Sequence, residues 1–277
     1  MTDLVSLVAQ RTSGASPRRD KPFLSFSQVS TFLRCPRQYQ YRYVRGIRTP
    51  ASGAMVQSRA FHEAVARNYR QKVSSNEDLP MSEMQEFFIE RFEQAFARGD
   101  AALEPHEKAG VLKDQGVAIT AAHHRFIAPG VEPLLVEHRF RIDLGEDSPF
   151  DLVGVWDLVE RDATVADHKA YRKAPRQEMV DRDLQLGLYA LAFCTISGET
   201  ECRLRMDAVV KDASPWTRQL STLRTQKDCL WLKGLLGEVG RAIQAGRFYP
   251  NPNGWHCDPR FCGYWTRCMG TTEEVTS

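Results

Sequence analysis

The sequence of 277 residues lacks any apolar run near the ~20 residues that a membrane-spanning helix requires. Its first residues also lack the apolar core of a secretory signal. We therefore expect a cytoplasmic protein that does not associate with membranes. The chain has seven cysteines, and an odd number in a protein that is not secreted argues against a disulfide framework.

A strong net charge is missing too, because 37 lysines and arginines nearly balance 35 acidic residues. The net charge of +2 alone therefore does not indicate a nucleic-acid-binding protein. The basic residues are unevenly distributed, since residues 1–50 carry nine of them and only two acids. Such asymmetry is typical of an end that faces a polyanion, and the alternative is a solvated tail. Residues 1–22, rich in serine, arginine and proline, predict a disordered basic tail.

The remaining residues, 23–277, predict one domain whose first part is helical and whose second part is mixed. A capping box, Ser25 with Gln28, predicts a helix from about Phe26 that Pro36 interrupts. A second capping box, Ser82 with Gln85, predicts a helix that stops at Gly99. Further helices are expected over 60–73 and 105–127, within a helical region of about 60–130.

The hydrophobic period then changes from helical to strand-like. Strands are expected over 133–142, 150–160, 163–169 and 202–211, and helices over 184–196 and 222–246. This order predicts an α/β or α+β fold with a central mixed sheet flanked by helices. The sheet and its helices form a core of about 131–246, followed by a cysteine-rich loop.

An acidic cluster on two of these strands carries the candidate chemistry. Asp167 and Lys169 are two residues apart on one strand and therefore share a face. A hairpin turn near 161–162 would place Asp157, on the preceding strand, opposite Asp167. Two carboxylates beside a lysine could hold Mg²⁺ or Mn²⁺, and a bound water could then attack a phosphodiester. The alternative is a pair of strand-end acids in a salt bridge with a lysine.

The order of motifs resembles the PD-(D/E)XK nuclease superfamily, and in particular its RecB-like branch, over roughly residues 25–270. Asp157 matches the first acid, and Asp167 and Lys169 match the (D/E)-x-K pair. Gln185 and Tyr189 match the Q-x-x-x-Y helix motif. His62 matches the histidine of a G-x-x-x-H helix, although Ser58 replaces the glycine. Glu137, on the strand before Asp157, is a further acidic candidate, because the branch often has an acid there.

The resemblance implies a restriction-endonuclease-like core and a role for each matched residue. The metal ion would be held by His62, Asp157, Asp167 and the backbone carbonyl of His168. Lys169 would assist the attacking water, and Gln185 and Tyr189 would position the lysine or the DNA.

A second candidate site is formed by cysteines. Cys257, Cys262 and Cys268 are spaced C-x4-C-x5-C, which is one thiolate short of a four-cysteine site. Cys35, beside a proline and between helices, is a better candidate for the fourth ligand than the other cysteines of the chain. The resemblance implies that this set binds a [4Fe–4S] cluster that connects residue 35 with residues 257–268. The family's usual cysteine trio begins with the spacing C-x2-C, whereas this sequence has C-x4-C. Zinc is the alternative occupant of the site.

These features predict a metal-dependent DNA exonuclease of DNA repair or recombination that acts on single strands or DNA ends. Helix residues near Cys35 are expected to contact DNA, or else to place their tyrosines in the core: Arg34, Arg37, Tyr39, Tyr41 and Arg42. One alternative is a nucleic-acid-binding subunit of a recombination or CRISPR-adaptation complex, whose nuclease site is idle or needs a helicase, recombinase or integrase partner. Another alternative is an enzyme of unrelated activity in which the four cysteines bind a structural zinc ion.

Overall fold

The strands expected from the sequence form a mixed sheet. The computed structural model describes residues 8–12, 21–99, 101–103, 107–146 and 148–269. The five long strands are β4 (Pro133–Ile142), β5 (Asp151–Glu160), β6 (Val165–Tyr171), β7 (Glu201–Val210) and β8 (Trp216–Thr225). Their order is β4-β5-β6-β7-β8. Strand β6 pairs antiparallel with β5 and parallel with β7, and β7 pairs antiparallel with β8.

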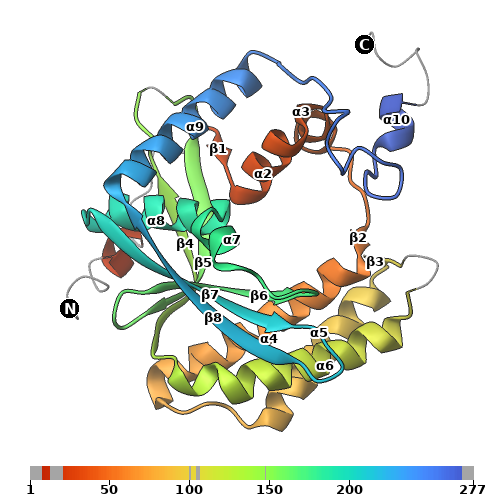
Figure 1. The fold of residues 1–277 in the computed structure, drawn as a ribbon, viewed down its shortest axis with the longest axis vertical. Helices are drawn as coiled ribbons and strands as arrows, with labels where there is room; N and C mark the ends of the chain where they lie inside the picture. Colours follow the sequence, from red (N-terminus) through yellow and green to blue (C-terminus); the bar gives the residue numbers. More distant parts are fainter. Residues whose placement is uncertain (1–7, 13–20, 100, 104–106, 147, 270–277) are drawn as a thin grey trace. The chain divides into compact units, whose positions relative to one another are not determined.

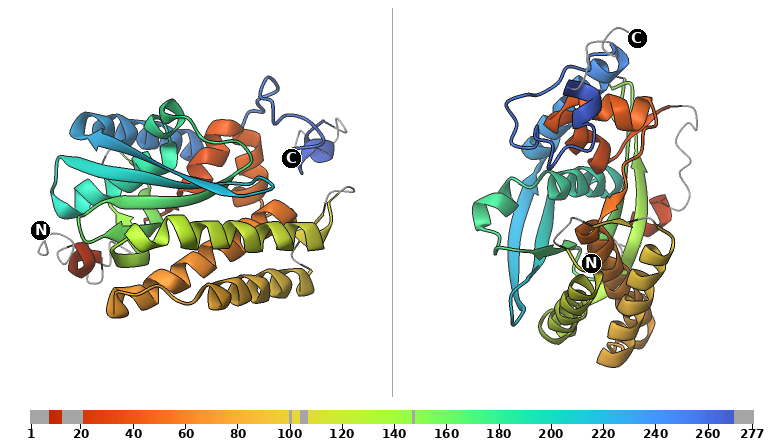
Figure 2. Two further views of the ribbon diagram at one scale, coloured as in Figure 1. Left: turned by 60° about the horizontal axis from the view of Figure 1, so that its bottom comes forward. Right: turned by 90° about the vertical axis from the view of Figure 1, so that its right-hand side faces the viewer.

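Helices cover both faces of this sheet (Figure 1). Helices α4 (Gly53–Ser75), α5 (Met81–Ala97) and α6 (Ala109–Phe126) pack together on one face, where α4 contacts β4 and β6 and α6 contacts β7 and β8. Figure 2 shows the three helices side by side. Helix α8 (Leu184–Ser197) packs against β4, β6 and β7 on the opposite face. This mixed α/β sheet between helices confirms the predicted fold class.

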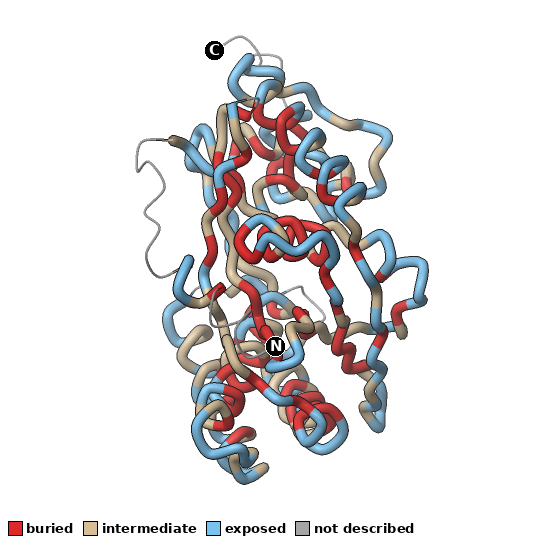
Figure 3. The backbone as a smooth tube through the Cα atoms, turned by 90° about the vertical axis from the view of Figure 1, so that its left-hand side faces the viewer, coloured by how far each residue is buried: buried red, intermediate tan, exposed pale blue. Residues whose placement is uncertain are grey.

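The core lies between the sheet and the helices, and its buried segments are red in Figure 3. Phe61, Tyr69, Phe88 and Ile119 from α4, α5 and α6 meet Leu158 of β5 in one apolar cluster. Burying each large side chain contributes about 1.5–3 kcal/mol relative to leaving it exposed. The same burial decides which face of each strand is buried, and therefore the direction in which the candidate side chains point.

Local capping explains several boundaries and corrects one prediction. The predicted capping box is formed at Ser25 and Gln28, and the helix that follows it begins at Phe26. Helix α5, in contrast, begins at Met81 with Pro80 before it and no side-chain cap, so the predicted box at Ser82 is wrong. Asp183 caps α8 by accepting a hydrogen bond from the Leu186 amide.

The remaining elements are shorter or were not predicted. The stretch predicted as a helix over 222–246 is the end of β8 followed by α9 (Gln226–Gln244). The other elements are β1 (Phe23–Leu24), α2 (Phe26–Arg34), α3 (Pro36–Tyr39), η1 (Gln40–Val44), β2 (Ala51–Ser52), β3 (Ala101–Ala102), η2 (Ala128–Gly130), α7 (Gln177–Asp181) and α10 (Trp265–Met269).

The chain forms two compact units, and the single domain predicted over 23–277 stays a prediction. The larger unit comprises the described parts of Met1–Pro17, Pro50–Ile142 and Gly154–Leu232. The smaller unit comprises the described parts of Arg18–Thr49, Asp143–Val153 and Lys233–Ser277, and in it β1 pairs in parallel with the start of β5.

The predicted disordered tail over 1–22 lies largely outside the described residues, and the prediction is wrong for residues 8–12. Those residues are helical. The Arg11 guanidinium donates to the Ile196 carbonyl at 2.7 Å, and the Thr12 hydroxyl lies 2.5 Å from the His138 ring. Val8 is fully buried. These contacts therefore hold residues 8–12 against the rest of the larger unit.

Candidate active site and cysteine cluster

Three side chains from separate elements of the larger unit converge on one point. His62 comes from α4, Glu137 from β4 and Asp157 from β5, and one potential ligand atom of each lies within 4.8 Å of the other two. His62 Nδ1 is 3.3 Å from Asp157 Oδ2. The three line a cleft of about 350 Å³ together with Arg59 and Arg70. Two carboxylates and an imidazole at this spacing suit a divalent ion such as Mg²⁺ or Mn²⁺.

Glu137 reaches this point through an unusual backbone conformation. Its φ of 48° is left-handed, although it lies in the middle of strand β4. Such a conformation costs a non-glycine residue on the order of 1–3 kcal/mol and clusters at functional sites. Burial and the neighbouring Asp157 raise the pKa of Glu137, while His62 and Arg70 oppose this shift. The observed position makes this weaker sequence candidate a full member of the site.

Asp167 and Lys169 lie on the same side of β6, as their spacing predicts. Lys169 Nζ is 3.0 Å from Asp167 Oδ2 and 3.5 Å from Asp183 Oδ2. Asp167 is fully buried, and Lys169 pairs with its Oδ2, while its Oδ1 makes no hydrogen bond to the described residues. A buried oxygen without a partner is costly unless a further group binds there, which fits a third carboxylate ligand beside Glu137 and Asp157.

The hairpin that joins the two carboxylate strands has the predicted register. Leu158 pairs with Ala166 and Val159 with Val165, so one further step along this register sets Asp157 opposite Asp167. The turn closes through the Glu160 amide, which donates to the Thr164 carbonyl at 2.9 Å. Counting from the turn was therefore sufficient to predict the register of the two strands.

Gln185 and Tyr189 form a hydrogen-bonded chain that ends on Asp157. Gln185 Nε2 donates to Tyr189 Oη at 2.9 Å, and Tyr189 Oη donates to Asp157 Oδ1 at 3.0 Å. The His168 amide donates to Asp157 Oδ2 at 3.2 Å. The Q-x-x-x-Y pair thus orients the Asp157 carboxylate, and the expected positioning of the lysine or the DNA stays a prediction. Asp183, beside Lys169, is a site residue that no motif indicated.

The side chain of His168 points away from this cluster into a buried polar network. Its Nδ1 is 3.5 Å from Asp207 Oδ2, and its ring packs 5.1 Å from the His123 ring. Asp207 is fully buried, and Arg205 donates to its two oxygens at 2.7 and 3.0 Å. The His168 side chain is therefore not a ligand candidate, and the role expected for its backbone carbonyl stays a prediction.

Burial and neighbouring charges shift the pKa values of the two aspartates of the cluster in opposite directions and raise that of the histidine. Burial favours protonation of Asp157, but the hydrogen bond and charge of His62 outweigh burial and lower the pKa of Asp157. Burial raises the pKa of Asp167 despite the nearby Lys169. For His62, burial alone would lower the pKa, yet Asp157 and Asp167 raise it to about 9. At pH 7 the imidazole is therefore protonated and must lose its proton before it can ligate a metal ion.

We expect Mn²⁺ binding to release protons and to strengthen by up to about tenfold per pH unit as the pH rises toward about 9. The sign follows from the raised pKa of His62, because protons compete with the metal below that value. Isothermal titration calorimetry in buffers of different ionisation enthalpy counts the released protons. The His62→Asn variant keeps an oxygen donor without a titrating group and should release fewer protons. Equal release by both proteins would contradict a ligand role for His62.

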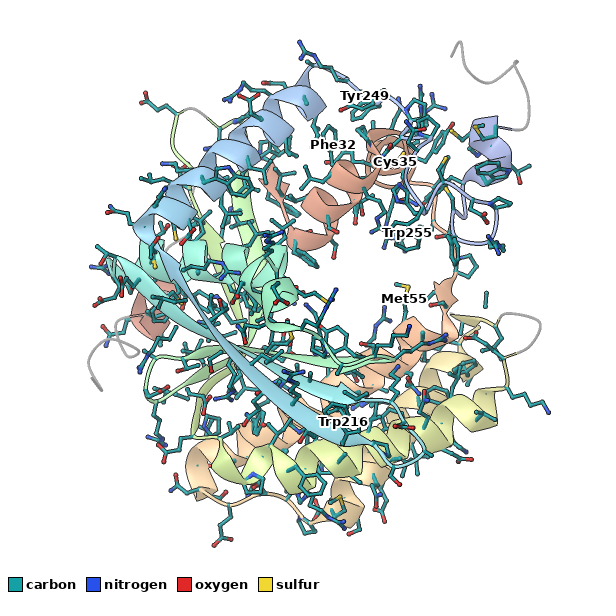
Figure 4. The ribbon with its side chains drawn as sticks, viewed as in Figure 1. Phe32, Cys35, Met55, Trp216, Tyr249 and Trp255 are labelled. Atoms are coloured by element: carbon teal, nitrogen blue, oxygen red, sulfur yellow. The ribbon has the colours of Figure 1, made fainter. Side chains whose placement is uncertain are left out.

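The four cysteines named by the sequence come together in the smaller unit. Cys35 lies between α2 and α3 and is labelled in Figure 4. It lines one pocket with Cys257, Cys262 and Cys268, and all four are partly exposed. Burial raises the pKa of Cys262 and Cys268, and the other thiols of the quartet add to this. Among the residues that the structure describes, no three of these sulfurs lie within 4.8 Å of one another.

The basic segment around Cys35, which runs from the end of α2 through α3 and η1, has buried and exposed residues. Tyr39 and Tyr41 are only 5% exposed. Tyr39 stacks on Phe248, and Tyr41 packs against Tyr264. These rings therefore leave no face for a base, and the expected stacking of Tyr39 and Tyr41 on DNA is corrected to a core role.

The arginines of this segment lie in α2, α3 and η1 and remain available to a polyanion. Arg34 and Arg42 are exposed. Arg37 is partly exposed and donates to Gln40 at 2.9 Å. This segment therefore presents these arginines to solvent, while Tyr39 and Tyr41 lie in the core.

A mixed sheet that carries a D…D-x-K set beside a His/Glu/Asp cluster is the arrangement of a metal-dependent nuclease. The chain belongs to the PD-(D/E)XK nuclease superfamily, whose sequence model matches residues 23–269.

The chain is similar at low sequence identity to two solved structures, of which the first shares its fold. One is a crystal structure of a “Putative exonuclease” from Eubacterium rectale, with a TM-score of 0.55 and 11% identity over 85% of this chain and 86% of that one. Another is the crystal structure of SSO0001, with a TM-score of 0.40 and 12% identity over 98% and 96% of the two chains. No curated protein sequence matches the chain. Among the described residues, none of the helices combines the length and apolar character needed to cross a membrane.

Proposed function

We propose that this nuclease is a metal-dependent DNA exonuclease that acts on single-stranded DNA or DNA ends. The observation that carries the proposal is the convergence of His62, Glu137 and Asp157 beside the buried Asp167 and Lys169. Its structural neighbour from Eubacterium rectale, described as a “Putative exonuclease”, supports the mode of action.

Each residue of the cluster has a definite role in phosphodiester hydrolysis. A bound Mg²⁺ or Mn²⁺ would supply an activated water and stabilise the charge that develops on the phosphate. His62, Glu137, Asp157 and Asp167 would hold the ion, together with the carbonyl of His168. Lys169 is cationic because Asp167 and Asp183 outweigh burial and raise its pKa, so it can stabilise negative charge on the attacked phosphate. Tyr189 fixes the Asp157 carboxylate through its hydroxyl.

Two arginines give the cleft the means to hold a nucleic-acid backbone. Arg59 and Arg70 lie on α4 on either side of His62, are exposed, and line the same cleft. Guanidinium groups bind phosphates in a bidentate geometry. We assign them to the phosphates that flank the scissile one, because the acidic cluster alone would repel the DNA strand.

For the cysteine site we propose a [4Fe–4S] cluster with a structural role. The four cysteines line one pocket, and four cysteine thiolates are the usual ligands of such a cluster. A tetrahedral zinc ion is the alternative occupant.

Digestion of labelled DNA tests the exonuclease proposal. Protein purified without oxygen and supplied with Mn²⁺ should shorten linear single strands from an end and leave circular single strands intact. Substrates labelled at the 5′ or the 3′ end report which end is attacked first. Cleavage of the circles would show endonuclease action. Intact linear and circular DNA would overturn the proposal in favour of a nucleic-acid-binding subunit.

A further inference from the structure

The cysteine-rich loop of the smaller unit presents two large aromatic rings to solvent. Trp255 is 76% exposed and Phe261 57%. Their ring centroids are 5.5 Å apart, and the planes are inclined by 73°. The Arg260 guanidinium lies 5.4 Å from the Phe261 ring. Trp255 is labelled in Figure 4. Single exposed apolar residues are common, but two adjacent aromatic rings with a cation form a patch of the kind that binds a partner.

Trp255 is held outward by a firmly anchored turn. Asn251 Nδ2 donates to the Arg34 carbonyl at 2.9 Å, and the Cys257 amide donates to the Gly254 carbonyl at 2.8 Å. The next residue, His256, is buried. A Cβ at Gly254 would lie 2.2 Å from the His256 ring, so only glycine lets that ring fold inward. The backbone on both sides of Trp255 is therefore anchored while its ring is exposed, which lowers the entropy that this segment loses on binding.

The charge around the two rings suits a polyanion. Residues 32–49 and 245–269, which surround the cysteine pocket, contain eight arginines and no lysine, with one acidic residue. That acid, Asp258, is bound by Arg260 at 2.9 Å. Arginine-rich surfaces bind phosphates, and exposed aromatic rings stack on bases. A duplex hides the faces of its bases, whereas a single strand offers them.

We propose that Trp255, Arg260 and Phe261 form a stacking platform for the unpaired bases of a single-stranded nucleic acid. The proposal deepens the proposed nuclease function and rests on it for the choice of nucleic acid as the partner. The arginines supply attraction that is independent of sequence, and the rings select strands whose bases are unstacked. Because every base has an aromatic face, the platform accepts any sequence.

Binding to two oligonucleotides of equal charge tests the platform. Holo-protein without added divalent ion is titrated into about 16 thymidines or an abasic backbone of equal length, both dye-labelled, with anisotropy as the readout. Trp255→Ala and Phe261→Ala should each weaken thymidine binding about tenfold, because one lost stack is worth roughly 1–3 kcal/mol. Binding of the abasic strand should stay within about twofold of the wild type. Trp255→Phe keeps a ring and should retain most of the affinity.

A matched tryptophan elsewhere supplies the control. Trp231 of α9 is 67% exposed and belongs to the larger unit, so Trp231→Ala should bind both strands as the wild type does. Equal losses for thymidine and abasic strands, or no difference between Trp255→Ala and Trp231→Ala, would overturn the platform. A protein that binds by stacking yet digests no DNA with Mn²⁺ would retain the platform and lose the exonuclease proposal.

Discussion

Replacing Asp157 with asparagine is expected to lower the rate of DNA cleavage by about a thousandfold. Removing one preorganised electrostatic group from an active site typically costs 10²–10³ in rate. Asp157 also accepts hydrogen bonds from Tyr189 at 3.0 Å and from the His168 amide at 3.2 Å, and it lies 3.3 Å from His62. Its negative charge is therefore central to the cluster, while asparagine has nearly the same shape. Initial rates on labelled single strands with Mn²⁺ measure the loss.

The Asp162→Asn variant is the matched control for this experiment. Asp162 lies in the turn after the same strand, its side chain is 57% exposed, and it contacts Thr164 within the turn. Its replacement should leave the rate within about twofold, since exposed charges contribute little. Both variants should bind single strands without metal as the wild type does. Cleavage by Asp157→Asn at the wild-type rate would contradict the assignment of the active site.

The part of the site that follows from local geometry could be predicted from the sequence. Residues two apart on a strand share a face, so Asp167 and Lys169 had to lie together. A short hairpin sets its own register, and counting from the turn placed Asp157 opposite Asp167. One turn of helix separates Gln185 and Tyr189, which explains their mutual hydrogen bond. These relations depend only on residues near one another in the chain.

Features that depend on distant contacts could not be predicted in this way. The left-handed backbone at Glu137 has no sequence signature, because any residue that the surrounding fold stabilises there can adopt it. The Tyr189 hydroxyl contacts Asp157 only because α8 packs on the sheet. Strand β8 was missed because it is largely exposed and polar, and therefore shows no apolar alternation. The burial of Tyr39 depends on Phe248, which is far away in the sequence.

Replacing Cys35 with serine is expected to remove the iron–sulfur absorption near ~400 nm and to lower the melting temperature by about 10 °C. Cys35 is the member of the quartet that lies far from the other three in sequence, so a cluster bound to all four closes a very long loop. Crosslinks that close loops of about 100 residues stabilise by roughly 4–5 kcal/mol in the loop-entropy model. Absorption spectra, iron content and thermal melts of anaerobically purified protein provide the measurement.

Cys194→Ser is the control, because Cys194 is also a partly exposed free cysteine but lies on α8 in the larger unit. It should retain the colour, the iron and a melting temperature within a few degrees of wild type. A Cys35→Ser protein with full iron content would remove Cys35 from the ligand set. Colourless wild-type protein with one zinc ion per chain would replace the cluster with zinc. The long-range crosslink, and with it the loss of stability on mutation, would persist in that case, because the loop-closure argument depends on the four ligands and not on the identity of the metal.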